Sequence, residues 1–269
     1  MFRLDDKVAV ITGAGGVICS ALAKDLARQG AKVALLDIRE EAAQTTANEI
    51  LNAGLGEAIA VQVDVLNKES VEAAAGKVHE AFGKVDILIN GAGGNHPRAT
   101  TGPEMSFFDL PAETLKWVFD LNFIGSVLPS QAFGKAMAKQ GSGSIVNIAS
   151  MASYRPLTRT VAYSSAKAAI VNFTQWLAVH CCQEYSPKIR VNAIAPGFLL
   201  TDQNRFLLTT EDGNLTQRGS LVIQNTPMAR FGAPEELSGA VIYLCSDTAS
   251  FVTGVVLPVD GGFNVYAGL

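Results

Sequence analysis

Residues 7–37 read KVAVITGAGGVICSALAKDLARQGAKVALLD, and this stretch decides the fold. An apolar run at 7–12 leads into a glycine-rich turn, an amphipathic segment at 17–29 and a second apolar run at 32–37. Short runs rich in β-branched residues are typical of buried strands, and the longer segment between them is typical of a helix. The stretch therefore predicts two parallel strands joined by a crossover helix.

The same alternation continues along the whole chain. It predicts further strands at 57–63, 85–90, 144–149, 189–195 and 255–259, and further helices at 40–53, 67–82, 111–137, 161–185 and 234–245. No internal repeat or low-complexity linker divides it. We therefore expect the α/β class, with residues 1–269 forming a single doubly wound (Rossmann) domain. Its parallel seven-stranded sheet should carry helices on both faces.

Two irregular segments interrupt the alternation, near 91–111 and 197–227. Each begins where a predicted strand ends. In open parallel sheets, ligands bind beyond the carboxyl ends of the strands. We expect these segments to form the rim of a substrate site.

One predicted helix carries a regular apolar pattern. Within 161–185, Phe173, Trp176, Leu177 and His180 recur at helical spacing. This pattern predicts that their face of the helix is buried, with His180 as an ordinary core histidine.

The composition excludes several classes of partner. The formal net charge is -4, and the basic residues form no run, so neither nucleic acid nor an anionic membrane is an expected partner. No apolar stretch reaches the roughly 18 residues of a membrane span. The four cysteines, Cys19, Cys181, Cys182 and Cys245, lack the spacing of a disulfide framework or a metal site. They favour a reducing, cytoplasmic location and no metal.

The glycine-rich turn predicts a dinucleotide site. Backbone N–H groups around Gly13, Gly15, Gly16, Val17 and Ile18 can meet a pyrophosphate at the start of a helix. A tight turn alone would carry the same glycines, but an acid follows at the end of the second strand.

That acid is Asp37, at a distance where a carboxylate can bind the adenine ribose hydroxyls. A carboxylate there repels the additional phosphate of NADP, so NAD is the expected coenzyme. Two alternatives remain open: Arg39 could reach a phosphate, and Asp37 could be an ordinary turn carboxylate.

Three residues suggest proton-transfer chemistry. Tyr163 and Lys167 stand four residues apart, on one face of a predicted helix, and Ser150 ends the fifth strand. A nearby ammonium stabilises a phenolate. Tyr163 could then take a hydroxyl proton while Ser150 holds the substrate oxygen. A tyrosine and a lysine at this spacing are more often an ordinary surface pair, so the prediction depends on all three residues together.

These residues occur with other recurring patterns: Thr12-Gly13, Asp64-Val65, Asn90-Gly91-Ala92-Gly93, Asn122, Tyr163-Ser164-Ser165-Ala166-Lys167 and Pro196-Gly197. Together they make the chain resemble the short-chain dehydrogenase/reductase family over nearly its full length. Val17 and Cys19 depart from the pattern, because the family usually has its second and third glycines at these positions.

The resemblance implies further site residues. Asn122 would complete a catalytic tetrad by positioning a water for proton relay through Lys167, and Thr201 would contact the nicotinamide carboxamide. Asp64 and Val65 would border the adenine. The other implied coenzyme contacts are Asn90, Gly91, Ala92, Tyr163, Lys167, Pro196, Gly197 and Leu199.

The rim segments contain polar groups suited to a sugar acid. The candidate substrate contacts are Asn95, His96, Arg98, Arg155 and Arg205. Arginine suits a carboxylate, and Asn or His suits hydroxyls. Each arginine taken alone is more typical of a solvated surface, and His96 of a loop-stabilising residue.

The rim also resembles one branch of the family. Stretches at 93–97, 204–209 and 212–216 resemble its D-mannonate oxidoreductases, which interconvert D-mannonate and D-fructuronate. Gluconate 5-dehydrogenase-like activity, a non-catalytic NAD-binding sensor and a sugar-nucleotide epimerase are the alternatives. The resemblance also implies a homotetramer.

Overall fold

The computed structural model describes residues 2–201 and 204–268. Its centre is a seven-stranded sheet of order β3-β2-β1-β4-β5-β6-β7, in which every neighbouring pair is parallel. The expected doubly wound sheet is therefore confirmed. The strands are β1 (Val8–Thr12), β2 (Lys32–Asp37), β3 (Ala58–Gln62), β4 (Ile87–Asn90), β5 (Gly143–Ile148), β6 (Ile189–Pro196) and β7 (Val256–Val259).

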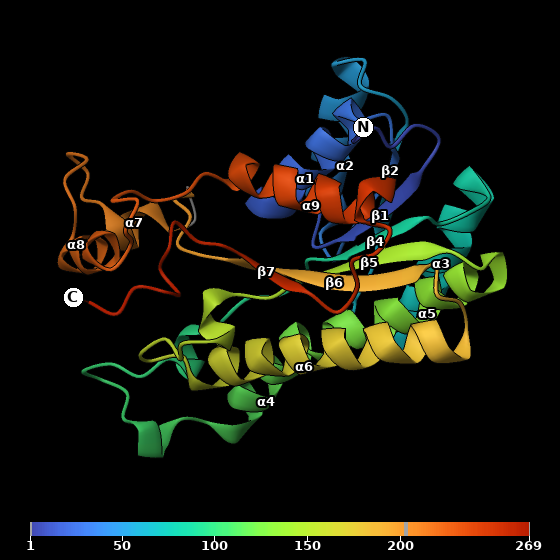
Figure 1. The fold of residues 1–269 in the computed structure, drawn as a ribbon. Helices are drawn as coiled ribbons and strands as arrows, with labels where there is room; N and C mark the ends of the chain where they lie inside the picture. The colour runs from blue at the N-terminus through green and yellow to red at the C-terminus, as the bar shows by residue number, and fades with distance from the viewer. Residues whose placement is uncertain (1, 202–203, 269) are drawn as a thin grey trace.

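Helices cover both faces of the sheet, as Figure 1 shows. One face carries α1 (Val17–Arg28), α2 (Glu40–Asn52) and α9 (Ser238–Cys245). The other carries α3 (Lys68–Phe82), α4 (Ala112–Asn122), α5 (Ile124–Gln140) and α6 (Val161–Glu184). No helix within the described ranges is both long and apolar enough to cross a membrane.

The alternation of side chains along β1 explains the two-sided core. Ala9 and Ile11 pack toward α1, α2 and α9, whereas Val8 and Val10 pack toward α3, α5 and α6. Successive side chains of a strand point to opposite faces, so a strand covered on both sides reads as a continuous apolar run.

The helix expected at 111–137 is instead two helices. It is interrupted at Phe123, and α4 and α5 lie on either side. The amide of Asn122 donates to the Val118 carbonyl at 2.8 Å and to the Gly94 carbonyl at 2.6 Å. A tertiary contact thus accompanies the break. The helix expected at 234–245 also begins with a separate 3-10 turn, Pro234–Leu237.

The predicted buried face of α6 is wrong. Trp176 is 57% exposed, and His180 stacks on it with ring centroids 4.7 Å apart. The buried face is formed by other residues of the helix: Ala162, Ser164, Ala166, Lys167, Ile170, Thr174, Ala178 and Cys181. Phe173 and Leu177 of the predicted face are half-buried and pack against the core, so the apolar pattern identified the border of the buried face and not its centre.

The irregular segments lie at the end of the sheet where the strands terminate (Figure 1). The 91–111 segment includes the 3-10 turns Pro97–Ala99 and Phe107–Asp109. The 197–227 segment includes α7 (Arg205–Leu208) and α8 (Gln217–Gln224), which project beyond the sheet.

Candidate active site

The glycine-rich turn brings the β1–α1 connection against β4. Gly13 has φ 68°, a backbone conformation that favours glycine, and a Cβ placed on it would lie 2.8 Å from the Ala92 Cα. Both the backbone conformation and the lack of space therefore exclude a side chain at this position. Gly16 precedes α1, and no side chain of the described residues caps it by a hydrogen bond. The first N–H groups of a helix attract anions. The turn is therefore suited to a phosphate.

Asp37 connects this turn to the end of β2. Its carboxylate accepts from the Gly15 N–H at 2.9 Å and from the Arg39 N–H at 2.9 Å. The residue is only 7% exposed, whereas its neighbour Ile38 is 62% exposed. The carboxylate is thus fixed beside the turn. An acidic group beside a phosphate-sized turn fits the adenosine half of NAD.

The residues implied to border the adenine differ in exposure. Asp64 is exposed, and its carboxylate accepts from the Leu66 N–H at 2.9 Å, which shapes the turn after β3. Val65 is 6% exposed and packs against Gly125, where an added Cβ would lie 3.0 Å from it.

Asn90 supports the sheet interior. Its amide donates to the Ser130 hydroxyl at 2.9 Å and to the Asn147 side-chain oxygen at 2.8 Å. Asn147 in turn donates to Thr174 on α6. The Asn90 side chain therefore joins β4, β5, α5 and α6, which leaves its backbone as the part able to line a coenzyme.

Three of the predicted catalytic residues come together at the end of β5. Lys167 Nζ lies 5.7 Å from the centroid of the Tyr163 ring and donates to the Ile148 carbonyl at 2.8 Å. The side chain of Ser150 lies close enough to Tyr163 for hydrogen bonding to lower the pKa of the phenol. The Ser150 Oγ also accepts from the Ala152 N–H at 3.1 Å, so its orientation is constrained.

Burial dominates the electrostatics of this group. It raises the pKa of Tyr163, and the hydrogen bond with Ser150 acts in the opposite direction. It also lowers the pKa of Lys167 to about 8. Both effects arise because burial disfavours the charged form of each group. The phenol is therefore neutral near pH 7, which suits it to donate a proton.

Asn122 lies beside this group through the loop after β4. Its side-chain oxygen accepts from the Gly94 N–H at 3.1 Å, and its amide donates back to the Gly94 carbonyl. A Cβ placed on Gly93 would lie 2.7 Å from the Asn122 Oδ1 and 3.4 Å from Lys167 Nζ. Asn122 and Lys167 thus meet across Gly93.

The rim places His96 and Arg98 against α4. The His96 Nδ1 accepts from the Arg98 N–H at 3.1 Å, and its ring meets Trp117 edge-on. Arg98 Nη2 lies 3.4 Å from a Glu113 carboxylate oxygen, with both side chains exposed. In this arrangement His96 stabilises the loop, and Arg98 already has an anionic partner.

The other rim candidates lie on separate segments. The Asn95 amide donates to Thr100 at 2.9 Å, within the same loop. The Arg155 guanidinium donates to the Tyr266 carbonyl at 2.9 Å and so meets the C-terminal segment. Arg205 is exposed at the start of α7.

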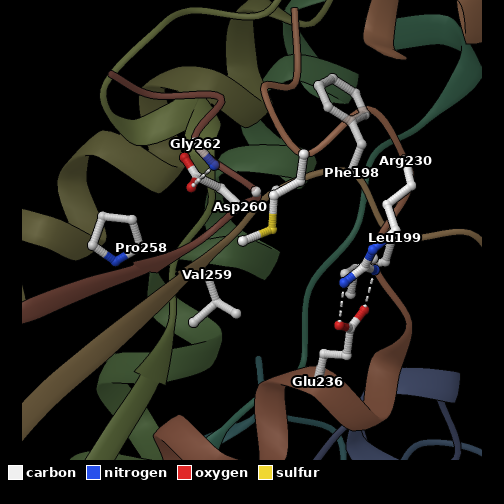
Figure 2. A pocket seen from close by; sticks show the side chains of 12 residues that line it. Phe198, Leu199, Arg230, Glu236, Pro258, Val259, Asp260 and Gly262 are labelled. Carbon is white, nitrogen blue, oxygen red and sulfur yellow. Dashed lines mark hydrogen bonds and ion pairs between the residues drawn. The ribbon is translucent and has the colours of Figure 1, made fainter. Parts of the chain in front are cut away.

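A cavity of about 370 Å³ lies between the ends of β6 and β7 (Figure 2). Gly197 and Leu199 line it, together with Asp260 and the paired Arg230 and Glu236. Gly197 follows Pro196, the last residue of β6, and a Cβ on it would lie 2.6 Å from the Asp260 Cα. The cavity therefore borders the implied nicotinamide side of the site.

The Leu199–Thr201 turn is held by Asn204, a residue that motif reasoning missed. The Asn204 amide donates to the Leu199 carbonyl at 2.7 Å, and its oxygen accepts from the Thr201 N–H at 2.9 Å. Asparagine is common in turns for this reason, which was the available signal.

Two further residues of the site were also not singled out. The Thr12 hydroxyl accepts from the N–H groups of Gly91 and Ala92, at 3.1 and 3.2 Å. Its place beside Gly13 in the motif was the available signal. Gly93 was quoted within a pattern, but its position between Asn122 and Lys167 needed the fold.

Comparison with known proteins finds relatives over nearly the whole chain. A family model described as enoyl-(acyl carrier protein) reductase matches residues 13–264. The uncharacterized oxidoreductase UxuB of Bacillus subtilis (strain 168) is 50% identical over 276 residues, which cover 99% of this chain and 98% of that protein.

Two solved structures are also similar over nearly the whole chain. One is a "putative D-Mannonate oxidoreductase" of Haemophilus influenza with bound NAD, with TM-score 0.94, 49% identity, and coverage of 99% of this chain and 98% of that one. The other is a gluconate 5-dehydrogenase of Burkholderia cenocepacia J2315 in complex with NADP and tartrate. It has TM-score 0.87, 30% identity, and coverage of 99% and 98%.

Proposed function

Because the chain belongs to the short-chain dehydrogenase/reductase family, whose members are NAD(P)-dependent oxidoreductases, we propose that it interconverts D-mannonate and D-fructuronate with NAD. The observation that carries the substrate is the 49% identity to the D-mannonate oxidoreductase structure, over 99% of this chain. One domain, residues 1–269, carries both the coenzyme site and the catalytic group.

Tyr163 is the proton-transfer residue in this proposal. In reduction, its phenol donates a proton to the substrate oxygen while the reduced coenzyme supplies a hydride to the carbonyl carbon. In oxidation, the hydroxyl proton passes to the phenolate as the hydride leaves the carbon. The Ser150 hydroxyl holds the substrate oxygen. Their hydrogen bond supports this arrangement because both groups can then address one oxygen.

Lys167 and Asn122 support that step. The buried ammonium of Lys167 stabilises negative charge on the phenol, since opposite charges attract strongly where water is excluded. Asn122 positions a water that returns the proton through Lys167. This role is supported by the closeness of both side chains to Gly93, where an added Cβ would lie 2.7 Å from the Asn122 Oδ1 and 3.4 Å from Lys167 Nζ.

The coenzyme is NAD rather than NADP in this proposal. Gly13, Gly15 and Gly16 form the phosphate-sized turn, with Val17 and Ile18 beginning α1. The buried carboxylate of Asp37 stands where the additional phosphate of NADP would meet a negative charge. The remaining coenzyme contacts are Asp64, Val65, Asn90, Gly91, Ala92, Pro196, Gly197, Leu199 and Thr201.

The substrate carboxylate is bound by an arginine of the rim. Arg155 is the first candidate, because Arg98 already faces the Glu113 carboxylate. Arg205, at the start of α7, is a further candidate. Arg155 donates to the Tyr266 backbone carbonyl, and because that group has no formal charge, the contact does not neutralise the guanidinium. Asn95 and His96 provide contacts for substrate hydroxyls.

Activity on another sugar acid is the second candidate. Its support is the similarity to the gluconate 5-dehydrogenase structure solved with NADP and tartrate, together with the polar rim residues Asn95, His96 and Arg98, since a steroid or acyl-chain pocket would need a more apolar rim. A non-catalytic sensor is disfavoured by the hydrogen bond between Ser150 and Tyr163 and by the buried Lys167 beside them.

The enzyme is a cytoplasmic homotetramer in this proposal. The four cysteines are free thiols in the structure, as suits a reducing compartment. The exposed Trp176 face of α6 supports an interface between copies, since large exposed apolar patches mark such contacts. Light scattering that gave a monomer would refute the assembly.

The purified protein should be assayed by NADH absorbance with D-fructuronate, and in reverse with D-mannonate, D-gluconate and a hydroxysteroid. We expect the highest kcat/KM for D-mannonate and D-fructuronate, at least 10-fold above D-gluconate. A preference for D-gluconate would replace the first candidate by the second. Tight NADH binding without turnover of any substrate would indicate a sensor.

A further inference from the structure

Cys19 occupies the space that a side chain at position 91 would need. A Cβ placed on Gly91 would overlap the Cys19 Sγ and would also lie 2.9 Å from the Thr12 carbonyl oxygen, while it would lie 3.7 Å from the Cys19 Cβ. The sulfur therefore rests directly on the Gly91 backbone. Cys19 is 3% exposed, so this contact is part of the interior.

The contact joins the two segments that frame the phosphate-binding turn. Cys19 lies in the first turn of α1, and Gly91 follows the last residue of β4. The Gly91 N–H is also bonded to Thr12, the last residue of β1. The separation of α1 from β4 at this point is thus set by the thickness of one sulfur atom.

The thiol is suited to packing and not to reaction. Burial raises the pKa of Cys19 to about 12, so the group remains a neutral thiol at physiological pH. The charges of Asp37 and Lys167 act on the pKa of this thiol in opposite directions, the first raising it and the second lowering it. A small apolar group there keeps the space between them filled and dry.

We propose that Cys19 and Gly91 are a matched positioning pair that sets how closely α1 approaches β4, and thereby places the glycine-rich turn for the coenzyme pyrophosphate. The pair does this with a cysteine at the position where the family pattern has its third glycine. The missing side chain at position 91 makes room for the thiol. This inference rests on the coenzyme part of the proposed function.

A double-mutant cycle tests the pair, using NADH fluorescence titration as the readout. Gly91→Ala should weaken NADH binding at least 10-fold, because atoms in contact cannot approach much below ~3.5 Å and α1 must move away. Cys19→Ala removes the sulfur and keeps a Cβ at an acceptable distance. In that background only the contact with the Thr12 carbonyl oxygen remains, so Gly91→Ala should cost at least 3-fold less NADH affinity than it costs in the wild type.

A second glycine provides a matched control. A Cβ on Gly143 would likewise overlap a sulfur, that of Met137, but at the start of β5, the opposite end of that strand from Ser150. Gly143→Ala should lower the melting temperature and leave the NADH Kd within 2-fold. If it weakens NADH binding as much as Gly91→Ala does, general destabilisation explains the loss and the positioning role is refuted.

The remaining outcomes also decide the matter. An unchanged Kd in Gly91→Ala, or an equal loss of NADH affinity for Gly91→Ala in the wild-type and Cys19→Ala backgrounds, overturns the pair. If Gly91→Ala does not fold, recovery of folded, NADH-binding protein in the double variant supports the pair, and failure to recover it overturns it. Failure of the wild-type chain to bind NADH refutes the proposed function instead.

Discussion

Replacing Gly93 with alanine should disable the catalytic group although none of its four residues is itself substituted. The added Cβ would lie 2.7 Å from the Asn122 Oδ1, too close for a carbon and an amide oxygen. Gly93 does not have a positive φ, so the backbone itself accepts alanine. The Asn122 amide must therefore move.

The structure gives the size of the effect. The moved amide loses its two hydrogen bonds to the Gly94 backbone, at 3.1 and 2.6 Å. At about 1 kcal/mol each, the loss is ~2 kcal/mol. If this loss appears in the transition state, kcat/KM falls roughly 30-fold. The NADH Kd should change much less, because the amide acts on the proton relay.

Steady-state reduction of D-fructuronate with NADH is the assay, paired with an NADH titration. Gly94→Ala is the matched control, since a Cβ there meets nothing within 4 Å and both backbone groups that bind Asn122 remain. The reasoning is refuted if Gly93→Ala keeps kcat/KM within 2-fold of wild type. It is also refuted if Gly94→Ala loses as much activity as Gly93→Ala.

Three further measurements follow from the site. Because the pKa of Lys167 is lowered to about 8, its ammonium is lost above that pH while Tyr163 is still neutral. The kcat/KM for reduction should therefore fall as the pH rises through about 8. A flat profile up to pH 9.5 would contradict this. Asp37→Ala removes the acceptor of the Gly15 N–H, so titrations should show weaker NADH binding. Because the glycine-rich turn loses this bond as well as the negative charge, the affinity for NADPH should rise less than about 3-fold. A larger rise would show that Asp37 acts by charge repulsion alone and does not hold the turn. Thr12→Val leaves two backbone N–H groups without their acceptor and should lower the free energy of unfolding by ~2 kcal/mol. The Tm in a thermal melt should then fall by about 4–8 °C. An unchanged Tm would show that the Thr12 hydroxyl does not stabilise the segment after β4.

The layered fold could be predicted from the sequence because its signals are local. Each strand is a short apolar run, and each helix begins and ends near a change of pattern, so the order of elements followed directly. The break at Phe123 could not be predicted this way. It accompanies the contact between Asn122 and the Gly94 backbone, two segments 28 residues apart. Nothing in the apolar spacing of 111–137 records that contact.

The wrong face of α6 has a related cause. Phe173, Trp176, Leu177 and His180 follow helical spacing as faithfully as a core face does. The face that packs on the sheet is instead built from small residues such as Ala166 and Ala178, because α6 lies close to the strands. The spacing of apolar residues shows that a helix has an apolar face, but it does not show whether the sheet or another surface covers that face.

The proximity of the candidate catalytic residues could be predicted from the sequence, and the contacts of the rim could not. Motif spacing placed Ser150, Tyr163 and Lys167 together, and the structure brings them together. The Arg98 contact with Glu113 was not predictable, because it joins a loop to a helix through two exposed side chains. Substrate specificity depends on such rim contacts, so it was the least accessible property.

The segment after β4 connects these observations, because three adjacent residues meet three different parts of the site. Ala92 lies against Gly13 of the phosphate turn, Gly91 lies against Cys19 of α1, and Gly93 lies between Asn122 and Lys167. Each contact allows no added atom without a shift. A displacement of this segment therefore alters the coenzyme turn and the proton relay together. Substitutions at positions 91 and 93 should consequently combine non-additively in kcat/KM, because they move one short piece of backbone.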